Sequence, residues 1–359
     1  MVLESEVYTD FLSLVRAGLG HSLNFLPSGI DWAAVRTHAE QQGLYAVVLD
    51  GIERLPEKQR PPQEFLLEWI GEVLQNYEYR YDVYKNTIAE MAGFYNSHGY
   101  KMMVLKGYAC GLNWPKPNHR PCGDIDIWQF GKQKEADDAV ANEKKIKIDN
   151  SHQHHTIFNW GEFTVENHYD YIDVHHRKTA PKLEKIFKEL GQDDSHFVEI
   201  NGEKVYLPSV NLHALFLVYH TMLHFTSTEM SIRQILDWGL FVEKHTKEID
   251  WDWLTGLIKE LHLNDFFNVI NAICVEDLGF STRIFYSVQF NPSLKDRILN
   301  DTLNPEFTGE EPAGLLSRIL FRFRRWKSHE WKHKLCYEES MWSIFWTSAW
   351  AHLLKPKTI

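Results

Sequence analysis

Two short stretches decide the fold of this chain: Met-Met-Val-Leu-Lys-Gly at residues 102–107 and Arg-Pro-Cys-Gly-Asp-Ile-Asp-Ile-Trp at residues 120–128. The first is an apolar run that ends at a glycine, a pattern typical of a buried strand followed by a turn, with Lys106 beside the turn. The second predicts another strand, which the chain enters through a glycine. We therefore expect residues 102–105 and 124–130 to be strands of one sheet.

Asp124 and Asp126 lie two positions apart on the second of these strands. Side chains alternate between the faces of a strand, so both carboxylates should project from one face, while Ile125 and Ile127 fill the other. Neighbouring carboxylates repel each other, and a hard cation such as Mg²⁺, which prefers oxygen ligands, would remove that repulsion. The alternative is an exposed strand end with two solvated aspartates. The preceding apolar strand and the nearby Arg120 favour the metal site.

A third strand is predicted at residues 163–168, Phe-Thr-Val-Glu-Asn-His, because apolar and polar residues alternate there. Glu166 and His168 should therefore point to the same side. Apolar residues recur at helical spacing before and after the strands, which predicts helices over residues 65–94 and 132–144.

Composition bounds the class of protein. With 359 residues, 44% hydrophobic and 24% charged, the chain has the make-up of an ordinary globular protein with two or three domains. A net charge of −11 argues against nonspecific nucleic-acid binding as the main role, although a nucleotide remains a possible substrate. Four cysteines without a Cys-x-x-Cys pair, an amino terminus without a signal-peptide pattern and no run long enough to span a bilayer predict a cytoplasmic protein.

Three features carry a resemblance to a known family: Leu-Lys-Gly at residues 105–107, Arg120, and Gly-Asp-Ile-Asp-Ile at residues 123–127. Together they resemble the signature of the uncharacterised bacterial nucleotidyltransferases in the polymerase-β-like superfamily. The resemblance implies an α/β (α+β) core with a small mixed sheet, flanked by helical regions. It also implies metal-dependent transfer of a nucleoside monophosphate from a nucleoside triphosphate, such as ATP, to an acceptor hydroxyl, with release of pyrophosphate. In one departure, Tyr108 follows Gly107 where many relatives have a serine that contacts phosphate.

The resemblance further implies a set of metal ligands. In the family a third carboxylate lies in a Val-Glu-x-His segment, which residues 165–168 match. We therefore expect Asp124, Asp126 and Glu166 to hold one or two Mg²⁺ ions, with Glu166 acting as a ligand or as the base for the acceptor hydroxyl. Asp173, in the segment Ile-Asp-Val-His, is the alternative third carboxylate.

Other residues are expected at the nucleotide phosphates. Lys106 and Arg120 are our candidates for neutralising phosphate charge, with Gly107 and Gly123 beside them, and the resemblance extends to Arg233 on a later helix, which would meet a phosphate or the acceptor. For Lys106 and Arg120, the alternative is a salt bridge to the aspartates themselves. For Arg233, the alternative is a hydrogen bond between helices.

Two further functions stay open at this point. A nucleotide-binding or scaffold protein could retain the fold without the reaction, and Tyr108 favours that reading. A metal-dependent phosphohydrolase would use His220, His224 and Asp237 as ligands on helices. A sugar, another small molecule, an RNA end and a protein hydroxyl are all possible acceptors for the transferase, although the net charge makes nucleic acid the least favoured of them.

A histidine-rich stretch raises the alternative of a zinc site. No cysteine supports these histidines, and their spacing fits no zinc finger or His-Glu-x-x-His helix. We expect scattered histidines that form hydrogen bonds around a polar cleft. The histidines concerned are His152, His154, His155, His168, His175 and His176.

The sequence predicts three regions: an amino-terminal helical region (1–95), the α/β core (96–205) and a carboxyl-terminal helical region (206–359). Within the last, basic residues crowd residues 318–332, and we expect them to be solvated or paired within the chain. The interleaved apolar residues Leu320, Phe321, Phe323 and Trp326 should be buried. The apolar residues 341–354 are too few to span a membrane and predict a buried helix.

Overall fold

The computed structural model describes residues 2–22, 29–152, 154–174, 179–227, 229–286, 289–306 and 312–342. The contacts within the chain define two compact units, which we describe separately. The sheet unit comprises Gln63–His213, and the helical unit comprises the described residues up to Pro62 and from Ala214 to Trp342. The three predicted regions remain a prediction about domains, whereas the contacts group the helices of residues 63–97 with the sheet.

A six-stranded mixed sheet forms the centre of the sheet unit, with the strand order β3-β4-β2-β1-β6-β5. β1 is antiparallel to β2 and parallel to β6, β2 is parallel to β4, and the outer pairs β3–β4 and β5–β6 are antiparallel. The strands are β1 (Met103–Val104), β2 (Ile125–Trp128), β3 (His155–Trp160), β4 (Phe163–His168), β5 (Phe197–Ile200) and β6 (Glu203–Tyr206). The helices of this unit are α4 (Gln63–Val73), η2 (Leu74–Tyr79), α5 (Arg80–Ser97), α6 (Tyr108–Gly111), η3 (Pro117–His119), α7 (Gln133–Ala139), η4 (Val140–Lys144) and α8 (Ala180–Leu190).

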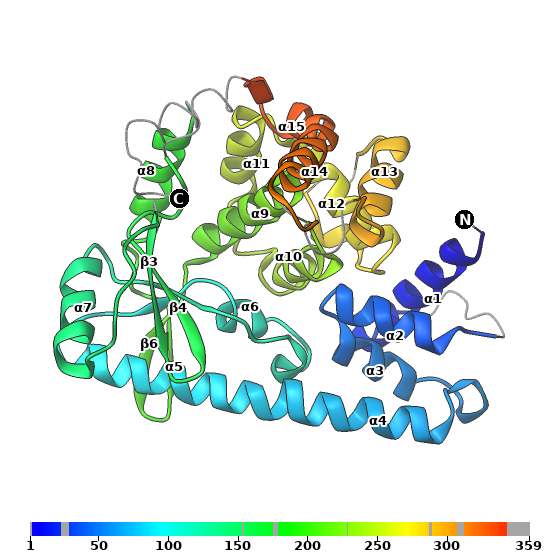
Figure 1. The fold of residues 1–359 in the computed structure, drawn as a ribbon, viewed down its shortest axis with the longest axis horizontal. Coiled ribbons are helices and arrows are strands. Elements are labelled where there is room, and N and C mark those ends of the chain that lie inside the picture. Colours follow the sequence, from blue (N-terminus) through cyan, green and yellow to red (C-terminus); the bar gives the residue numbers. More distant parts are fainter. Residues whose placement is uncertain are drawn as a thin grey trace. The chain divides into compact units, whose positions relative to one another are not determined.

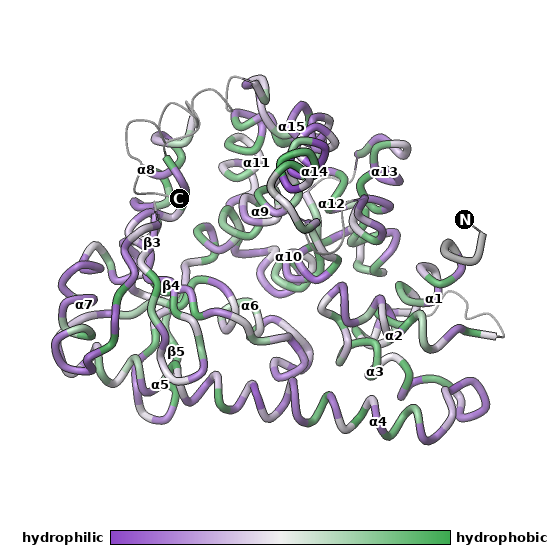
Figure 2. Tube along the Cα trace, viewed as in Figure 1, coloured by the Kyte–Doolittle hydropathy of each residue, from purple (hydrophilic) through white to green (hydrophobic). Residues whose placement is uncertain are grey.

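Helix α5 packs on one face of this sheet (Figure 1). Its buried residues Tyr84, Ile88 and Met91 belong to one apolar cluster with Ile127 and Val165 of the strands. Burying a large apolar side chain contributes about 1.5–3 kcal/mol. Figure 2 shows hydrophobic and hydrophilic residues alternating along the helix, as expected where one side packs and the other meets solvent. This face therefore holds the sheet unit together.

The three predicted strands all lie in one sheet, so that prediction is confirmed. The third strand has the predicted bounds, whereas β1 and β2 are shorter than the predicted 102–105 and 124–130. The predicted helix at 65–94 is the stretch from α4 to α5, which contains the π-helical segment η2.

Strands β3, β5 and β6 are not among the predictions, although turn signals mark them. Asn201 and Gly202 join β5 to β6 with φ of 53° and 84°, the backbone that a type I′ hairpin requires. Gly161 begins the two-residue turn between β3 and β4 with φ of 59°. An Asn-Gly pair between alternating segments is a strong hairpin signal in a sequence.

Two helices of the helical unit, α2 and α10, begin at well-defined N-caps. The Asp31 carboxylate accepts a hydrogen bond from the Ala34 N–H (3.0 Å), and Ser231 and Gln234 form a capping box at α10. The helices are α1 (Val2–Leu19), α2 (Trp32–Gln41), α3 (Tyr45–Glu53), η1 (Glu57–Gln59), α9 (Val210–Ser227), α10 (Ile232–His245), α11 (Trp251–Glu260), α12 (Asn264–Glu276), η5 (Thr282–Ile284), α13 (Pro292–Leu303), α14 (Leu315–Ser328) and α15 (Glu330–Cys336). The predicted α+β fold, a small mixed sheet with helices before and after it, is confirmed.

Two predictions concern the basic stretch at residues 318–332: that its charges are solvated or paired, and that its apolar residues are buried. Arg325 and Lys332 are paired within the chain, with Glu229 at 3.7 Å and Asp301 at 2.5 Å. The interleaved apolar residues are not all buried: Leu320 is 50% exposed and Phe323 is 48% exposed. Their burial was predicted from apolarity, but α14 presents them on its solvent side. The predicted helix at 341–354 lies outside the described residues, apart from its first two.

No helix in the described part of the chain has both the length and the apolar character needed to cross a membrane.

Candidate functional site

The site begins with the register of two neighbouring parallel strands. Asp126 on β2 lies opposite Glu166 on β4, so both carboxylates project from the same face of the sheet. This face is the reverse of the one that packs on α5, because Ile125 and Ile127 point into the apolar cluster. The predicted alternation is thus what brings these two carboxylates together.

Asp126 is more deeply buried than Glu166, with only 1% of its surface exposed. Its Oδ1 lies 2.6 Å from Lys106 Nζ and 3.1 Å from His168 Nε2. Burial alone would raise the pKa of Asp126, but the Lys106 ammonium and the hydrogen bond to His168 outweigh it and hold the pKa well below its usual value. The other oxygen, Oδ2, is buried and has no hydrogen-bond partner among the described residues.

Lys106 and His168 are polar partners of this carboxylate. Burial opposes the charge on both, yet the pKa of Lys106 is raised by Asp126 and Asp124, and that of His168 by its contacts with Asp126 and Glu166. The alternative proposed from the sequence for Lys106, a salt bridge to an aspartate, is therefore present in the structure.

Glu166 adds a second carboxylate beside His168. Its Oε2 lies 3.6 Å from His168 Nε2, and this contact lowers the pKa of Glu166. Ligand atoms of Asp126, Glu166 and His168 all lie within 4.8 Å of one another, which suits a single cation. Asp173, the alternative third carboxylate, is not in this group.

Asp124 lies at the entrance of β2 and is exposed, outside that tight group. Desolvation and the nearby carboxylates of Asp126 and Glu166 raise the pKa of Asp124. Its backbone carbonyl accepts a hydrogen bond from the Tyr84 hydroxyl at 2.9 Å. The charges of Asp126 and Glu166 therefore disfavour the ionised form of Asp124.

Gly107 is required by its turn. It has φ of 48°, and a Cβ atom there would lie 2.2 Å from the Tyr84 hydroxyl oxygen. Tyr84 therefore contacts both the turn after β1 and the entrance of β2. Sequence reasoning missed Tyr84, because its only signal is an apolar position on an amphipathic helix. Tyr108, next to Gly107, is buried in the apolar cluster.

The other predicted phosphate contacts are less closely tied to the carboxylates. Arg120 is buried and donates a hydrogen bond to the carbonyl of Pro121 at 3.3 Å. Gly123 is surrounded by open space, so no packing requires a glycine there. Arg233 lies on α10 in the helical unit, where its side chain covers Gly43.

The histidines are clustered, so the expectation of scattered histidines is wrong for three of them. Ligand atoms of His154, His155 and His168 lie within 4.8 Å of one another. Burial lowers the pKa of both His154 and His155 to about 4. The sequence signal was the His-rich segment itself, but the pairing with His168 depends on β3, which was not predicted. His175 and His176 lie outside the described residues.

The ligands suggested for a phosphohydrolase do not form a comparable group. Nε2 atoms of His220 and His224 lie 3.2 Å apart on α9. Among the residues that the structure describes, neither group of three possible ligands includes this pair or Asp237.

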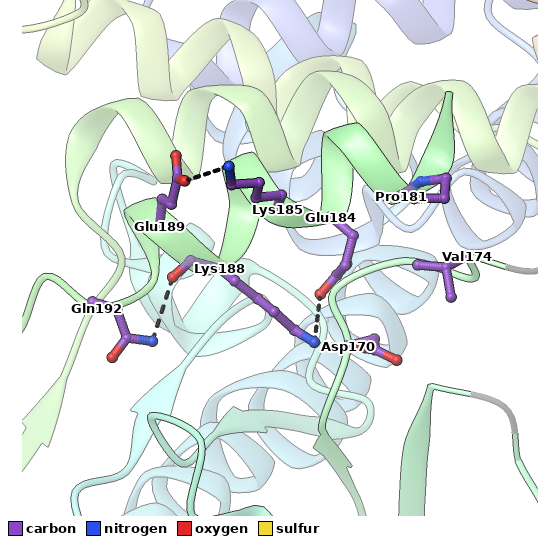
Figure 3. A pocket seen from close by; sticks show the side chains of 8 residues that line it. All are labelled: Asp170, Val174, Pro181, Glu184, Lys185, Lys188, Glu189 and Gln192. Carbon is purple, nitrogen blue, oxygen red and sulfur yellow. Dashed lines mark hydrogen bonds and ion pairs between the residues drawn. The ribbon is translucent and has the colours of Figure 1, made fainter. Parts of the chain in front are cut away.

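A pocket of about 580 Å³ opens along α8, beside the segment that follows β4 (Figure 3). Glu184 accepts hydrogen bonds from the backbone N–H groups of Tyr171 and Ile172 at 3.1 and 3.0 Å, and burial raises its pKa to about 7. Lys188 lies 3.6 Å from the Glu184 carboxylate and also contacts Asp170. These contacts fix the chain after β4. The carboxylates of the candidate site are not part of the pocket lining.

Comparison with known proteins supplies independent information. The model of a family described as uncharacterised nucleotidyltransferase matches residues 28–279. Among solved structures, the chain is similar to the crystal structure of an antigenic nucleotidyltransferase-like protein from Paracoccidioides brasiliensis, with 14% sequence identity and a TM-score of 0.34. That similarity covers 49% of this chain and 87% of the other. No curated protein sequence matches the chain.

Proposed function

Because the chain belongs to the family of uncharacterised nucleotidyltransferases, we propose that it transfers a nucleoside monophosphate from a nucleoside triphosphate to a hydroxyl acceptor. The acceptor is a sugar, another small molecule or a protein. The observation that carries this proposal is the in-register pair of Asp126 and Glu166, with Lys106 bound to the first of them. This arrangement places two carboxylates and one cation on a single face of the sheet.

The donor set fits Mg²⁺. Asp126 Oδ2 is a buried oxygen without a hydrogen-bond partner among the described residues, and such an atom is costly unless a ligand satisfies it. Asp124 and Glu166 supply further carboxylate oxygens, which are the ligands that Mg²⁺ prefers. Asp124, Asp126 and Glu166 would hold one or two Mg²⁺ ions. When bound, Mg²⁺ neutralises phosphate charge and favours in-line displacement at the α-phosphorus.

The remaining residues bind the nucleotide and move the proton. Lys106, whose ammonium lies 2.6 Å from Asp126 Oδ1, is our candidate for neutralising phosphate charge. Arg120, Gly107 and Gly123 are our further candidates for the phosphate-binding surface. Glu166 serves either as a metal ligand or as the base that accepts the proton of the acceptor hydroxyl, while the hydroxyl oxygen bonds to the α-phosphorus and pyrophosphate leaves.

One observation favours a second candidate, a nucleotide-binding protein of the same fold that lacks the reaction. Tyr108 is only 5% exposed and packs in the apolar cluster, with its ring stacked on Tyr81 at 6.2 Å. It does not replace the serine hydroxyl that contacts phosphate in many relatives. Both candidates bind nucleotide, and they differ in whether pyrophosphate is released.

Thermal unfolding with Mg²⁺ and nucleotide tests the shared site. Mg²⁺ and a nucleoside triphosphate together should raise the melting temperature by more than the sum of their separate effects, because the cation offsets the carboxylate charge. A ligand at a hundred times its dissociation constant stabilises by about 2.7 kcal/mol. Asp124→Asn and Asp126→Asn should abolish the synergy, each measured against its own ligand-free melting temperature.

Asp138→Asn is the matched control, because Asp138 is an exposed carboxylate on α7. It should keep the full synergy. Two further measurements then separate the transferase from a nucleotide-binding protein without the reaction. The transferase should release labelled pyrophosphate, and it should transfer label from the α-phosphate to a product in cell extract. If both site variants retain the synergy, the aspartate pair is not the nucleotide site.

A further inference from the structure

Three histidines meet where β3 begins and β4 ends. The antiparallel register places His155 opposite His168, so their side chains share one face. His154 precedes β3, and its carbonyl accepts hydrogen bonds from the N–H groups of Tyr169 and Asp170, both at 3.1 Å. These backbone bonds fix His154 beside the strand pair. Ring centroids lie 4.3 Å apart for His154 and His155, and 5.3 Å apart for His155 and His168.

Two of these imidazoles have an unsatisfied nitrogen. Nδ1 of His154 and Nδ1 of His155 are buried and have no hydrogen-bond partner among the described residues. His155 as a whole is 7% exposed, so water has little access to it. A buried polar atom without a partner costs about 1–3 kcal/mol, and native proteins rarely leave several together. A ligand that accepts nitrogen lone pairs would remove this cost.

We propose that His154, His155 and His168 bind a borderline divalent transition-metal ion of the Zn²⁺ class. Imidazole nitrogen suits Zn²⁺, Co²⁺ or Ni²⁺, whereas Mg²⁺ prefers the carboxylates nearby. Three protein ligands with one open position is a ligand number found in zinc sites. This site is additional to the proposed Mg²⁺ site and does not rest on nucleotidyl transfer.

Groups around the histidines favour a cation there. Glu166 Oε1 lies 4.0 Å from His155 Nε2, too far for a hydrogen bond but close enough for the negative charge to favour a cation. Both nitrogens of His168 face hydrogen-bond acceptors, with Nε2 3.1 Å from Asp126 Oδ1 and Nδ1 3.3 Å from the carbonyl oxygen of Asp170, so a metal ion bound to His168 takes the place of one of its protons. His168 is shared with the carboxylate group, so its substitution would affect both sites. His154 and His155 are therefore the positions to test.

Zn²⁺ binding to the full-length, chelator-treated protein tests this site. Titration with Zn²⁺ should show a site from which excess Mg²⁺ does not displace the Zn²⁺. Co²⁺ bound at the same site should give the visible absorption of a four-coordinate ion. His154→Gln and His155→Gln should each weaken Zn²⁺ binding at this site by at least about tenfold, since even supporting partners of a ligand are typically worth 10–100-fold. His154 is only partly buried and precedes the strand, so its substitution should leave the fold intact.

Two control variants sharpen the result. His152→Gln changes an exposed histidine stacked on His155 at 4.9 Å, outside the group of three. His220→Gln removes half of the histidine pair on α9. Both should retain the site with its Co²⁺ spectrum. The proposal is overturned if the wild type lacks such a site, if His154→Gln and His155→Gln bind Zn²⁺ like the wild type, or if only His220→Gln loses binding. Nucleotide synergy is measured separately, so either proposal can fail alone.

Discussion

The two faces of the sheet differ in polarity. The face toward α5 is apolar and packed, with Ile127 and Val165 among its residues. The opposite face carries Asp126, Glu166 and His168, whose burial is unfavourable unless each charge has a partner. The same strands supply both faces by alternation. One face therefore stabilises the fold, while the other gathers groups that ligands would satisfy, and substitutions on the apolar face should change stability without changing binding.

The largest effect is expected on the apolar face. Ile127→Ala should lower the free energy of unfolding by about 4 kcal/mol, through lost burial and the cavity left behind, and Ile127→Val by about 1 kcal/mol. Urea unfolding, with hydrogen exchange of the strand amides to localise the change, measures both. Under conditions where the variant stays folded, it should keep the synergy of Mg²⁺ and nucleotide. A folded variant without that synergy would show that the two faces are not separable.

The sequence predicts some features of the two sheet faces and not others. Alternation was sufficient to predict β4 and the shared side of Glu166 and His168, because residues two positions apart on a strand point to the same face. It could not predict that Asp126 lies opposite Glu166, because register between strands far apart in sequence depends on packing. The family resemblance supplied that link as an expectation.

The groups that complete the charged face were harder to predict. Tyr84 reaches the entrance of β2 from α5, and no local pattern signals that contact. The histidine cluster requires β3, which was not predicted from the sequence although Gly161 begins a turn at its end. Tyr108 was recognised as a departure from the family pattern, yet its burial in the core follows only from the packing of Tyr81 and α5.

A smaller loss is expected at the centre of the charged face. Asp126→Asn removes one charged partner of the Lys106 ammonium and should lower the free energy of unfolding of the ligand-free protein by about 3 kcal/mol at pH 7. The pKa of Asp126 is lowered in the folded state, so its contribution is present at neutral pH and is lost as the pH falls below the ordinary value of 3.8. Unfolding at pH 7 and under acid conditions should show the difference between wild type and variant shrinking. A variant as stable as wild type at pH 7 would mean that the ion pair contributes nothing net.

The smallest effect, with the opposite sign, is expected two residues earlier. The pKa of Asp124 is raised in the folded state, so its charge opposes folding, and Asp124→Asn should stabilise the ligand-free protein at pH 7. The gain should be below about 1 kcal/mol, because solvent screens a carboxylate this exposed. It should be present at neutral pH and vanish as the pH falls below 3.8, where the wild-type carboxyl is protonated both folded and unfolded. Parallel urea titrations of wild type, Asp124→Asn and the exposed control Asp138→Asn measure it. Because the same substitution should abolish nucleotide synergy, a variant that is both less stable and still responsive to Mg²⁺ would place Asp124 with the structural residues instead of the charged site.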